Sequence, residues 1–199
     1  MRKKVVSNTR EKLIDVTISM LWRNNYVATS VEKICRSAGI KKGSFYHHFT
    51  SKSELSVVSI RHLWDRLRED LWMPVFSDKS LTSVEKFTKL LYKIYVQQRT
   101  CKREEGKTLG CPLGNIGLEM AVHDEDVRKT LTLIFKEQLE LFEKELNSGT
   151  ERKLIPPGDN RQKAIAVLSY IEGMNMLARI HNKPEFLKSA TMLEVILLN

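Results

Sequence analysis

The chain has few cysteines and no long apolar run. Its three cysteines, Cys35, Cys101 and Cys111, are an odd number without a CxxC pair. This pattern argues against a disulfide framework and a metal site, and it favours a reducing compartment. No apolar stretch approaches the length of a membrane span, and the basic N-terminus lacks the apolar core of a signal peptide. We therefore expect a cytoplasmic protein with no structural metal and no membrane association.

Sequence patterns of catalysis are also missing. The 199 residues contain no nucleophile elbow, phosphate loop, HExxH pair or dinucleotide fingerprint. Carboxylates cluster at Glu104-Glu105 and at residues 124–126. These clusters fall in an expected loop and at an expected helix start, where they stay solvated or stabilise the helix dipole. We therefore expect neither an enzyme nor a cofactor.

Period-2 alternation is scarce, whereas helical periodicity runs through almost the whole chain. The pattern predicts an all-α protein. Pro74 is expected to end the fourth helix, and Gly106, Gly110, Gly149 and residues 156–158 mark loops. The expected helices span about residues 9–24, two short segments within 29–50, and then about 51–71, 81–101, 112–122, 124–147, 160–181 and 184–198.

The segment from Thr29 to Lys52 predicts two short helices joined by a tight turn, followed by the start of a long helix. Thr29 with Glu32, and Ser51 with Glu54, form capping-box patterns at two helix starts. Gly39 occupies the position where a helix-turn-helix needs a positive φ or a close approach, so the chain is expected to turn there. Asn25 is expected to end the first helix in a left-handed conformation.

Positive charge is concentrated around these helices. Residues 1–60 contain eleven Lys/Arg against four Asp/Glu, a net of +7, whereas residues 61–199 have a net of only +2. A basic segment on a near-neutral body is typical of a module that binds a polyanion. A basic surface that only aids solubility is the alternative, but it would not require the charge to be so localised.

The second short helix favours DNA as the polyanion. Cations and short donors at the start of a helix suit phosphates and base edges in a major groove. Tyr46 could instead pack against neighbouring helices, and for His48 a core or capping role is preferred. The basic residues 2–4 could reach a minor groove or remain a solvated tail. The helix presents Lys41, Lys42, Ser44, Tyr46, His47 and His48.

The segment resembles the TetR family of bacterial transcription regulators over about residues 9–56. Two positions depart from the family pattern, because Asn25 replaces a usual Gly and Lys41 replaces a usual small hydroxyl residue. The second departure predicts a weaker cap on the recognition helix. The resemblance rests on Thr9-Arg10, residues 26–31, Ile34, residues 38–40, the run Lys42-Gly43-Ser44-Phe45-Tyr46-His47-His48-Phe49, and residues 51–55.

The resemblance implies a helix-turn-helix DNA-binding domain over residues 1–55 and a larger helical ligand-binding and dimerisation domain over 56–199. It also implies a repressor that binds a palindromic operator on double-stranded DNA as a homodimer and is released by a small-molecule inducer. A nonspecific architectural DNA-binding protein is the alternative, although it would not need the large second domain. The residues that the resemblance assigns to DNA are Thr29, Lys41, Lys42, Gly43, Ser44, Tyr46, His47 and Lys52.

For the ligand, large side chains on the later helices are candidates, although for each one alone a place in an ordinary core is favoured. The last two helices, about 160–181 and 184–198, carry small and apolar residues suited to a four-helix dimer interface. An intramolecular core is the alternative for some of them. The ligand candidates are Trp64, Tyr92, Tyr95, Met120 and Met174, together with Trp72, Phe87 and Phe135.

Cys111 is a further sensing candidate, because it precedes Pro112 at an expected helix start. A thiol at a helix N-terminus tends toward the reactive thiolate. The segment is also similar to one in TetR-family relatives that sense electrophiles through a cysteine. A buried, unreactive cysteine beside a glycine-rich bend is the alternative.

Overall fold

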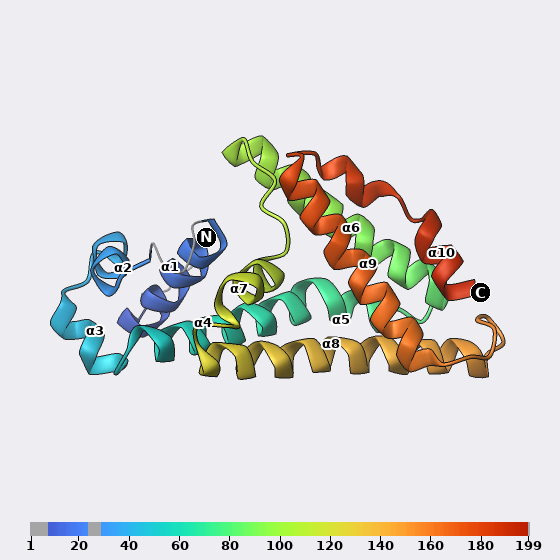
Figure 1. The fold of residues 1–199 in the computed structure, drawn as a ribbon, viewed down its shortest axis with the longest axis horizontal. Coiled ribbons are helices and arrows are strands. Elements are labelled where there is room, and N and C mark those ends of the chain that lie inside the picture. The colour runs from blue at the N-terminus through green and yellow to red at the C-terminus, as the bar shows by residue number, and fades with distance from the viewer. Residues whose placement is uncertain (1–7, 24–28, 199) are drawn as a thin grey trace, which may run out of the picture. The chain divides into compact units, whose positions relative to one another are not determined.

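The computed structural model describes residues 8–23 and 29–198 (Figure 1). Every regular element in these two ranges is a helix, so the all-α prediction is confirmed. In the same ranges, no helix has the length and apolar character needed to cross a membrane. The elements are α1 (Thr9–Arg23), α2 (Val31–Ala38), α3 (Lys42–His48), α4 (Lys52–Leu67), η1 (Arg68–Trp72), α5 (Met73–Phe76), α6 (Ser83–Glu105), α7 (Pro112–Met120), α8 (Glu125–Glu151), α9 (Asn160–Ile180), η2 (Pro184–Lys188) and α10 (Thr191–Leu198).

The chain forms two compact units. The first, called the head here, comprises Met1–Asp65 and Asn115–Thr132, and the second, called the body, comprises Arg66–Gly114 and Leu133–Asn199. Helices α4, α7 and α8 each contribute residues to both units. Cys111, which directly precedes α7, therefore belongs to the body, whereas most of α7 belongs to the head.

The core of the head is an apolar cluster shared by α1, α2, α3 and α4. Phe45 and Leu55 are fully buried in it. Gly39 ends α2 with a φ of 63°, so the predicted turn is confirmed and the positive φ is the reason for the glycine. The cluster consists of Leu13, Ile14, Ile34, Cys35, Ala38, Phe45, Phe49 and Leu55.

The caps of the head helices differ from the prediction at one position. The N-cap of α2 is Ser30, whose Oγ accepts a hydrogen bond from Lys33 N at 3.2 Å, so the Thr29–Glu32 box is wrong by one residue. Ser51 Oγ accepts from Glu54 N at 3.0 Å as predicted. The Glu54 carboxylate, however, accepts from Thr50 N at 2.6 Å. In a capping box this carboxylate would accept from the backbone N–H of Ser51, so the observed bond is displaced by one residue.

In the body, three predicted boundaries are wrong. Pro74 does not end the fourth helix, because it lies in the first turn of α5, where its missing N–H costs no hydrogen bond. A π-helical turn, η1, connects α5 to α4. Gly149 lies inside α8 and not in a loop, and the predicted helix over 184–198 divides into η2 and α10. A Cβ at Gly149 would collide with Ser83 and Ile155, so close packing explains the glycine.

The core of the body is built on stacked aromatic rings. The rings of Trp72 and Phe142 stack at 5.1 Å, and Phe76 and Phe87 meet edge to face at 5.5 Å. Phe87 also meets Phe142 edge to face at 5.0 Å. Contacts of α10 and η2 with α6 and α9 complete the bundle (Figure 1).

Candidate DNA interface and ligand cavity

Helix α3 is held on one side only. Phe45 is 0% exposed and fixes the helix to the core of the head, with its ring 6.1 Å from that of Phe49. The flanking residues Lys42, Ser44 and His47 are exposed. The short helix therefore presents a polar, basic surface that the head itself does not cover.

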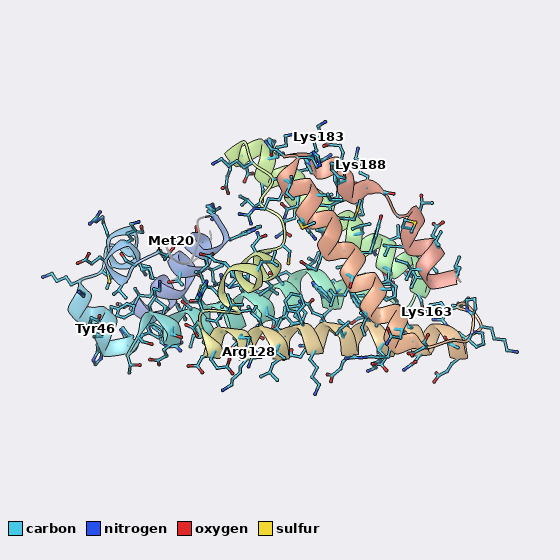
Figure 2. All side chains as sticks on the ribbon, viewed as in Figure 1. Met20, Tyr46, Arg128, Lys163, Lys183 and Lys188 are labelled. Atoms are coloured by element: carbon cyan, nitrogen blue, oxygen red, sulfur yellow. The ribbon has the colours of Figure 1, made fainter. Side chains whose placement is uncertain are left out.

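Tyr46 has features of both roles considered from the sequence, which are contact with DNA and packing against neighbouring helices. Its ring meets Phe45 edge to face at 5.0 Å, so part of it packs on the helix. The residue is nevertheless 52% exposed, and Figure 2 places it at the surface of α3. The side chain is thus oriented by packing while much of it stays available to a partner.

Lys41 and Gly43 complete this surface. Lys41 is the N-cap of α3 and makes no capping hydrogen bond with its side chain, as the departure from the family pattern predicted. A Cβ at Gly43 would meet no atom within 4 Å, so packing among the described residues does not require a glycine there. We call the exposed set Lys41, Lys42, Gly43, Ser44, Tyr46 and His47 the α3 surface.

Thr29 and Lys52 do not belong to the α3 surface. Thr29 is 1% exposed, which contradicts the prediction that it meets a phosphate from the surface. Lys52 Nζ donates a hydrogen bond to Thr29 O at 2.9 Å and thereby links α4 to the segment before α2. Burial lowers the pKa of Lys52, and nearby Glu119 and Asp124 partly oppose this shift. In this structure the partly buried ammonium group joins two segments of the head.

His48 is only partly exposed, and its ring lies 5.1 Å from that of His47. Its placement agrees with the preferred packing role. The predictions for the basic residues 2–4 and for Asn25 lie outside the described residues.

A small cavity of about 40 Å³ lies within the body. Of the predicted sensing residues, it is lined by Cys111 and Trp72. Its apolar wall includes Leu71, Trp72, Ile94, Leu113, Leu168 and Ile171. Its polar wall consists of Gln97, Gln98, Cys111, Gln138, Glu172 and Asn175.

The other ligand candidates do not line this cavity. Trp64 and Met120 are buried residues of the head. Tyr92 is 57% exposed, and Tyr95 is buried with the Lys188 ammonium 5.0 Å above its ring. Met174 is partly exposed on α9. The size of a side chain therefore did not identify the cavity wall.

The segment of residues 109–111 is held by hydrogen bonds between its backbone and the side chain of Gln98. Gln98 Oε1 accepts from Leu109 N at 2.9 Å and from Gly110 N at 2.8 Å, while its Nε2 donates to Gly110 O at 3.1 Å. Gly110 adopts a φ of 71°, and a Cβ there would press on Asn175 O at 3.3 Å. These contacts place Cys111 at the cavity.

The surroundings of Cys111 oppose the thiolate form, contrary to the expectation from its place before a helix. Burial is the main cause that raises the pKa of its thiol well above the usual value, and the neighbouring Glu172 carboxyl raises it further. The hydrogen bond from Gly114 N to Cys111 Sγ, at 3.3 Å, acts in the opposite direction but does not reverse the shift. The position at a helix N-terminus favours a lower thiol pKa, but burial and the nearby acid raise the pKa by more.

We therefore expect Cys111 to react slowly with thiol reagents at neutral pH. Each unit of raised pKa lowers the thiolate fraction about tenfold. Mass spectrometry of the native protein with N-ethylmaleimide should show modification of Cys111 at least about tenfold slower than of glutathione. Modification as fast as that of glutathione, lost in Cys111→Ser, would restore the sensor interpretation.

Sequence reasoning missed the acid and amides of the cavity. Glu172 and Asn175 lie three residues apart on α9, so they share a helix face. The sequence places them in the stripe of Leu168 and Ile171, and a polar pair inside an apolar stripe was the available indication. Gln138 on α8 and Gln98 on α6 gave none, because isolated glutamines are common on exposed helix faces.

Comparisons with known proteins agree with this architecture. The family profile for the N-terminal domain of bacterial regulatory proteins of the tetR family matches residues 13–57. The profile for the C-terminal domain of LmrA/YxaF-like transcriptional regulators matches residues 88–192, which is more than half of the chain.

Individual relatives extend over nearly the whole chain. An uncharacterised HTH-type transcriptional regulator from the lacX 3′ region of Lactococcus lactis is 25% identical over 92% of this chain and 89% of its own length. The HTH-type transcriptional repressor NemR of Escherichia coli K12 is 22% identical over 96% of this chain and 94% of its own.

Solved structures share the fold. Reduced E. coli NemR superposes with a TM-score of 0.81 at 21% identity, covering 96% of this chain and 98% of its own. A TetR regulator from Rhodobacter sphaeroides gives 0.80 at 23% identity, covering 93% and 96%. The chain belongs to the TetR family of bacterial regulatory proteins and is a ligand-responsive, DNA-binding transcriptional regulator of the repressor type.

Proposed function

We propose that the protein is a cytoplasmic homodimer that binds a palindromic operator through two copies of the α3 surface, and that it has no catalytic activity. The supporting observation is that α3 has Phe45 fully buried while six neighbouring residues stay exposed. A helix held in this way can enter a major groove without disturbing the core behind it. Gly43, which internal packing does not require, lets the DNA backbone approach closely.

The dimer is supported by the apolar surface of the last two helices. Met176 and Ile180 on α9, and Met192 and Val195 on α10, are exposed apolar side chains. Large exposed apolar residues grouped on adjacent helices are typical of an interface between subunits. Two α9–α10 pairs could pack as a four-helix bundle and so place two heads on symmetric half-sites.

Release from DNA is proposed to begin at the cavity in the body. Pro112 and Leu113, the first residues of α7, line the cavity, and the rest of α7 belongs to the head. Near the end of α7, Glu119 acts electrostatically on Lys52. A small molecule in the cavity can therefore shift the helix that continues into the head. It changes DNA affinity only by the difference in its affinity for the two states.

The first test replaces two members of the α3 surface. Lys42→Ala and Tyr46→Phe should each weaken binding to the selected operator by about 1–3 kcal/mol where a charged or hydrogen-bonded contact is lost. Folding should change little, because both side chains are exposed. Fluorescence anisotropy with a labelled duplex measures the affinity.

The matched control is Lys144→Ala, which removes an exposed lysine of α8 in the body. It should leave operator affinity unchanged, apart from a small uniform effect of net charge. If Lys42→Ala and Tyr46→Phe both bind as tightly as this control, α3 does not contact the DNA.

A further inference from the structure

The polar groups of the cavity include acceptors without a partner. Gln138 Oε1 and Asn175 Oδ1 are buried and accept no hydrogen bond from the part of the chain that the structure describes. Asn175 Nδ2 donates to Ile171 O at 3.1 Å. Because a carbonyl can only accept, this bond fixes which end of the Asn175 amide is the nitrogen. The unpartnered atom is therefore an acceptor.

The Gln98 amide is held by the backbone and donates to neither of these acceptors. Its Oε1 accepts two backbone N–H groups, and its Nε2 donates to Gly110 O. An unmet buried acceptor costs free energy until a donor reaches it. Gln138 and Asn175 thus leave two acceptor positions open to a molecule that brings N–H or O–H groups.

A half-buried acid lies at the same cavity. Glu172 lines it, and burial raises the pKa of its carboxyl group. Among the described lining residues there is no lysine or arginine to neutralise that carboxylate. A Cβ at position 114 would collide with Glu172 Oε2, so Gly114 provides the space that the carboxylate occupies.

We propose that this cavity binds an organic cation, a protonated amine carried on an apolar body, with Glu172 as the counter-ion and the Gln138 and Asn175 carbonyl oxygens as acceptors. This assignment rests on the proposed ligand-responsive function and names the chemical class of its inducer. An ammonium group carries up to three N–H donors and a positive charge, which matches two acceptors and one acid.

Other occupants fit less well. An anion would face the Glu172 carboxylate, and the lining residues that the structure describes include no lysine or arginine to balance the two charges. A water or an alcohol could donate to Gln138 or Asn175, but it would leave an ionised Glu172 without a counter-charge. A protonated amine satisfies both requirements together, and its positive charge favours the ionised form of the carboxyl group.

The walls suit the rest of such a ligand. Trp72, Leu168 and Ile171 are apolar and buried, and the face of an indole ring attracts cations. The volume of about 40 Å³ is close to that of one water molecule or one ammonium group. The head group therefore fits the cavity as it stands, whereas the apolar body must displace side chains. That displacement gives binding a means to move the start of α7.

The test compares three probes of similar shape on the full-length protein without DNA. They are 2-phenylethylammonium, 2-phenylethanol and phenylacetate, and binding is followed by tryptophan fluorescence and by thermal shift. We expect the ammonium ion to bind at least about tenfold more tightly than the alcohol, which corresponds to about 1.4 kcal/mol, and the carboxylate more weakly still. Equal affinity for the ammonium ion and the alcohol, or no binding of the ammonium ion, would overturn the proposal.

A variant of Glu172 tests whether this side chain causes the preference for the ammonium ion over the alcohol. Glu172→Gln keeps the shape of the side chain and removes its charge, so the preference for ammonium over alcohol should fall to less than about threefold. The control Glu140→Gln removes an exposed carboxylate of α8 and should keep the wild-type preference. A preference that survives in Glu172→Gln refutes the assignment. If that variant folds poorly, the wild-type comparison of ammonium with alcohol decides alone.

Operator binding, measured separately, distinguishes this inference from the function on which it rests. Wild-type protein that selects an operator but does not prefer the ammonium ion would remove only the ligand class. Protein that prefers the ammonium ion but binds no DNA would remove the proposed function and leave the cavity assignment intact.

Discussion

Phe45→Ala is expected to unfold the head and abolish operator binding. Phe45 is fully buried and packs against Phe49 and the other members of the α1–α4 cluster. Truncation of such a ring costs about 3–5 kcal/mol, from lost apolar burial and the cavity left behind. A small helical unit has little stability in reserve, so this loss is a large fraction of the total. Urea denaturation followed by far-UV circular dichroism measures it.

The neighbouring Tyr46 is the control for this experiment. Tyr46→Phe keeps the ring that meets Phe45 and removes only an exposed hydroxyl, so stability should change by less than about 0.5 kcal/mol. The two variants should both lose operator affinity, but only Phe45→Ala should lose structure. A Phe45→Ala protein that stays within about 1 kcal/mol of wild type would show that this ring does not hold α3 in place.

Lys86→Ala is expected to destabilise the body by about 3–5 kcal/mol. Lys86 Nζ lies 2.9 Å from Glu145 Oε2, and both side chains are buried. Ser83 Oγ donates to Glu145 Oε1 at 2.7 Å, but this bond does not neutralise the charge. Removal of the lysine therefore leaves a carboxylate buried without its counter-ion, which costs more than the pair itself contributes. Thermal and urea unfolding measure the loss.

The same helix offers a matched control. Lys89 Nζ lies 3.0 Å from Asp78 Oδ2, but these side chains are 41% and 28% exposed. Solvent screens such a pair, so Lys89→Ala should cost less than about 1 kcal/mol. If Lys86→Ala costs no more than Lys89→Ala, the buried pair has little part in the stability of the body.

The sequence predicted the helices of the head well because their determinants are local. The apolar stripe of α1, the turn at Gly39 and the exposed start of α3 all follow from residues within a few positions of one another. The choice of Ser30 over Thr29 as N-cap was not local. Both residues have a hydroxyl group, and Thr29 is instead tied to Lys52 from another helix.

Boundaries in the body were harder to predict because distant contacts decide them. Gly149 resembles a loop residue in sequence, yet it stays helical where Ser83 and Ile155 leave no room for a side chain. Pro74 resembles a helix terminator, yet it begins the next turn after a π-helical segment. In each case the residue has two structural uses, and tertiary packing selects one of them.

The cavity was the least predictable feature for the same reason. Cys111 could be found from its position before Pro112, but its pKa depends on Glu172, which comes from α9. A helix N-terminus alone predicts a lowered thiol pKa, whereas burial beside an acid predicts the reverse. Only the fold brings these two residues together.

Selection of duplexes from a random DNA pool, repeated at two salt concentrations, tests the central claim most directly. Two α3 surfaces related by dimer symmetry should enrich inverted half-sites about one helical turn apart. Affinity should fall as salt rises, and the selected duplex should remain favoured over unselected DNA. Enrichment of no sequence, or equal binding to every duplex at both salt concentrations, would contradict the account.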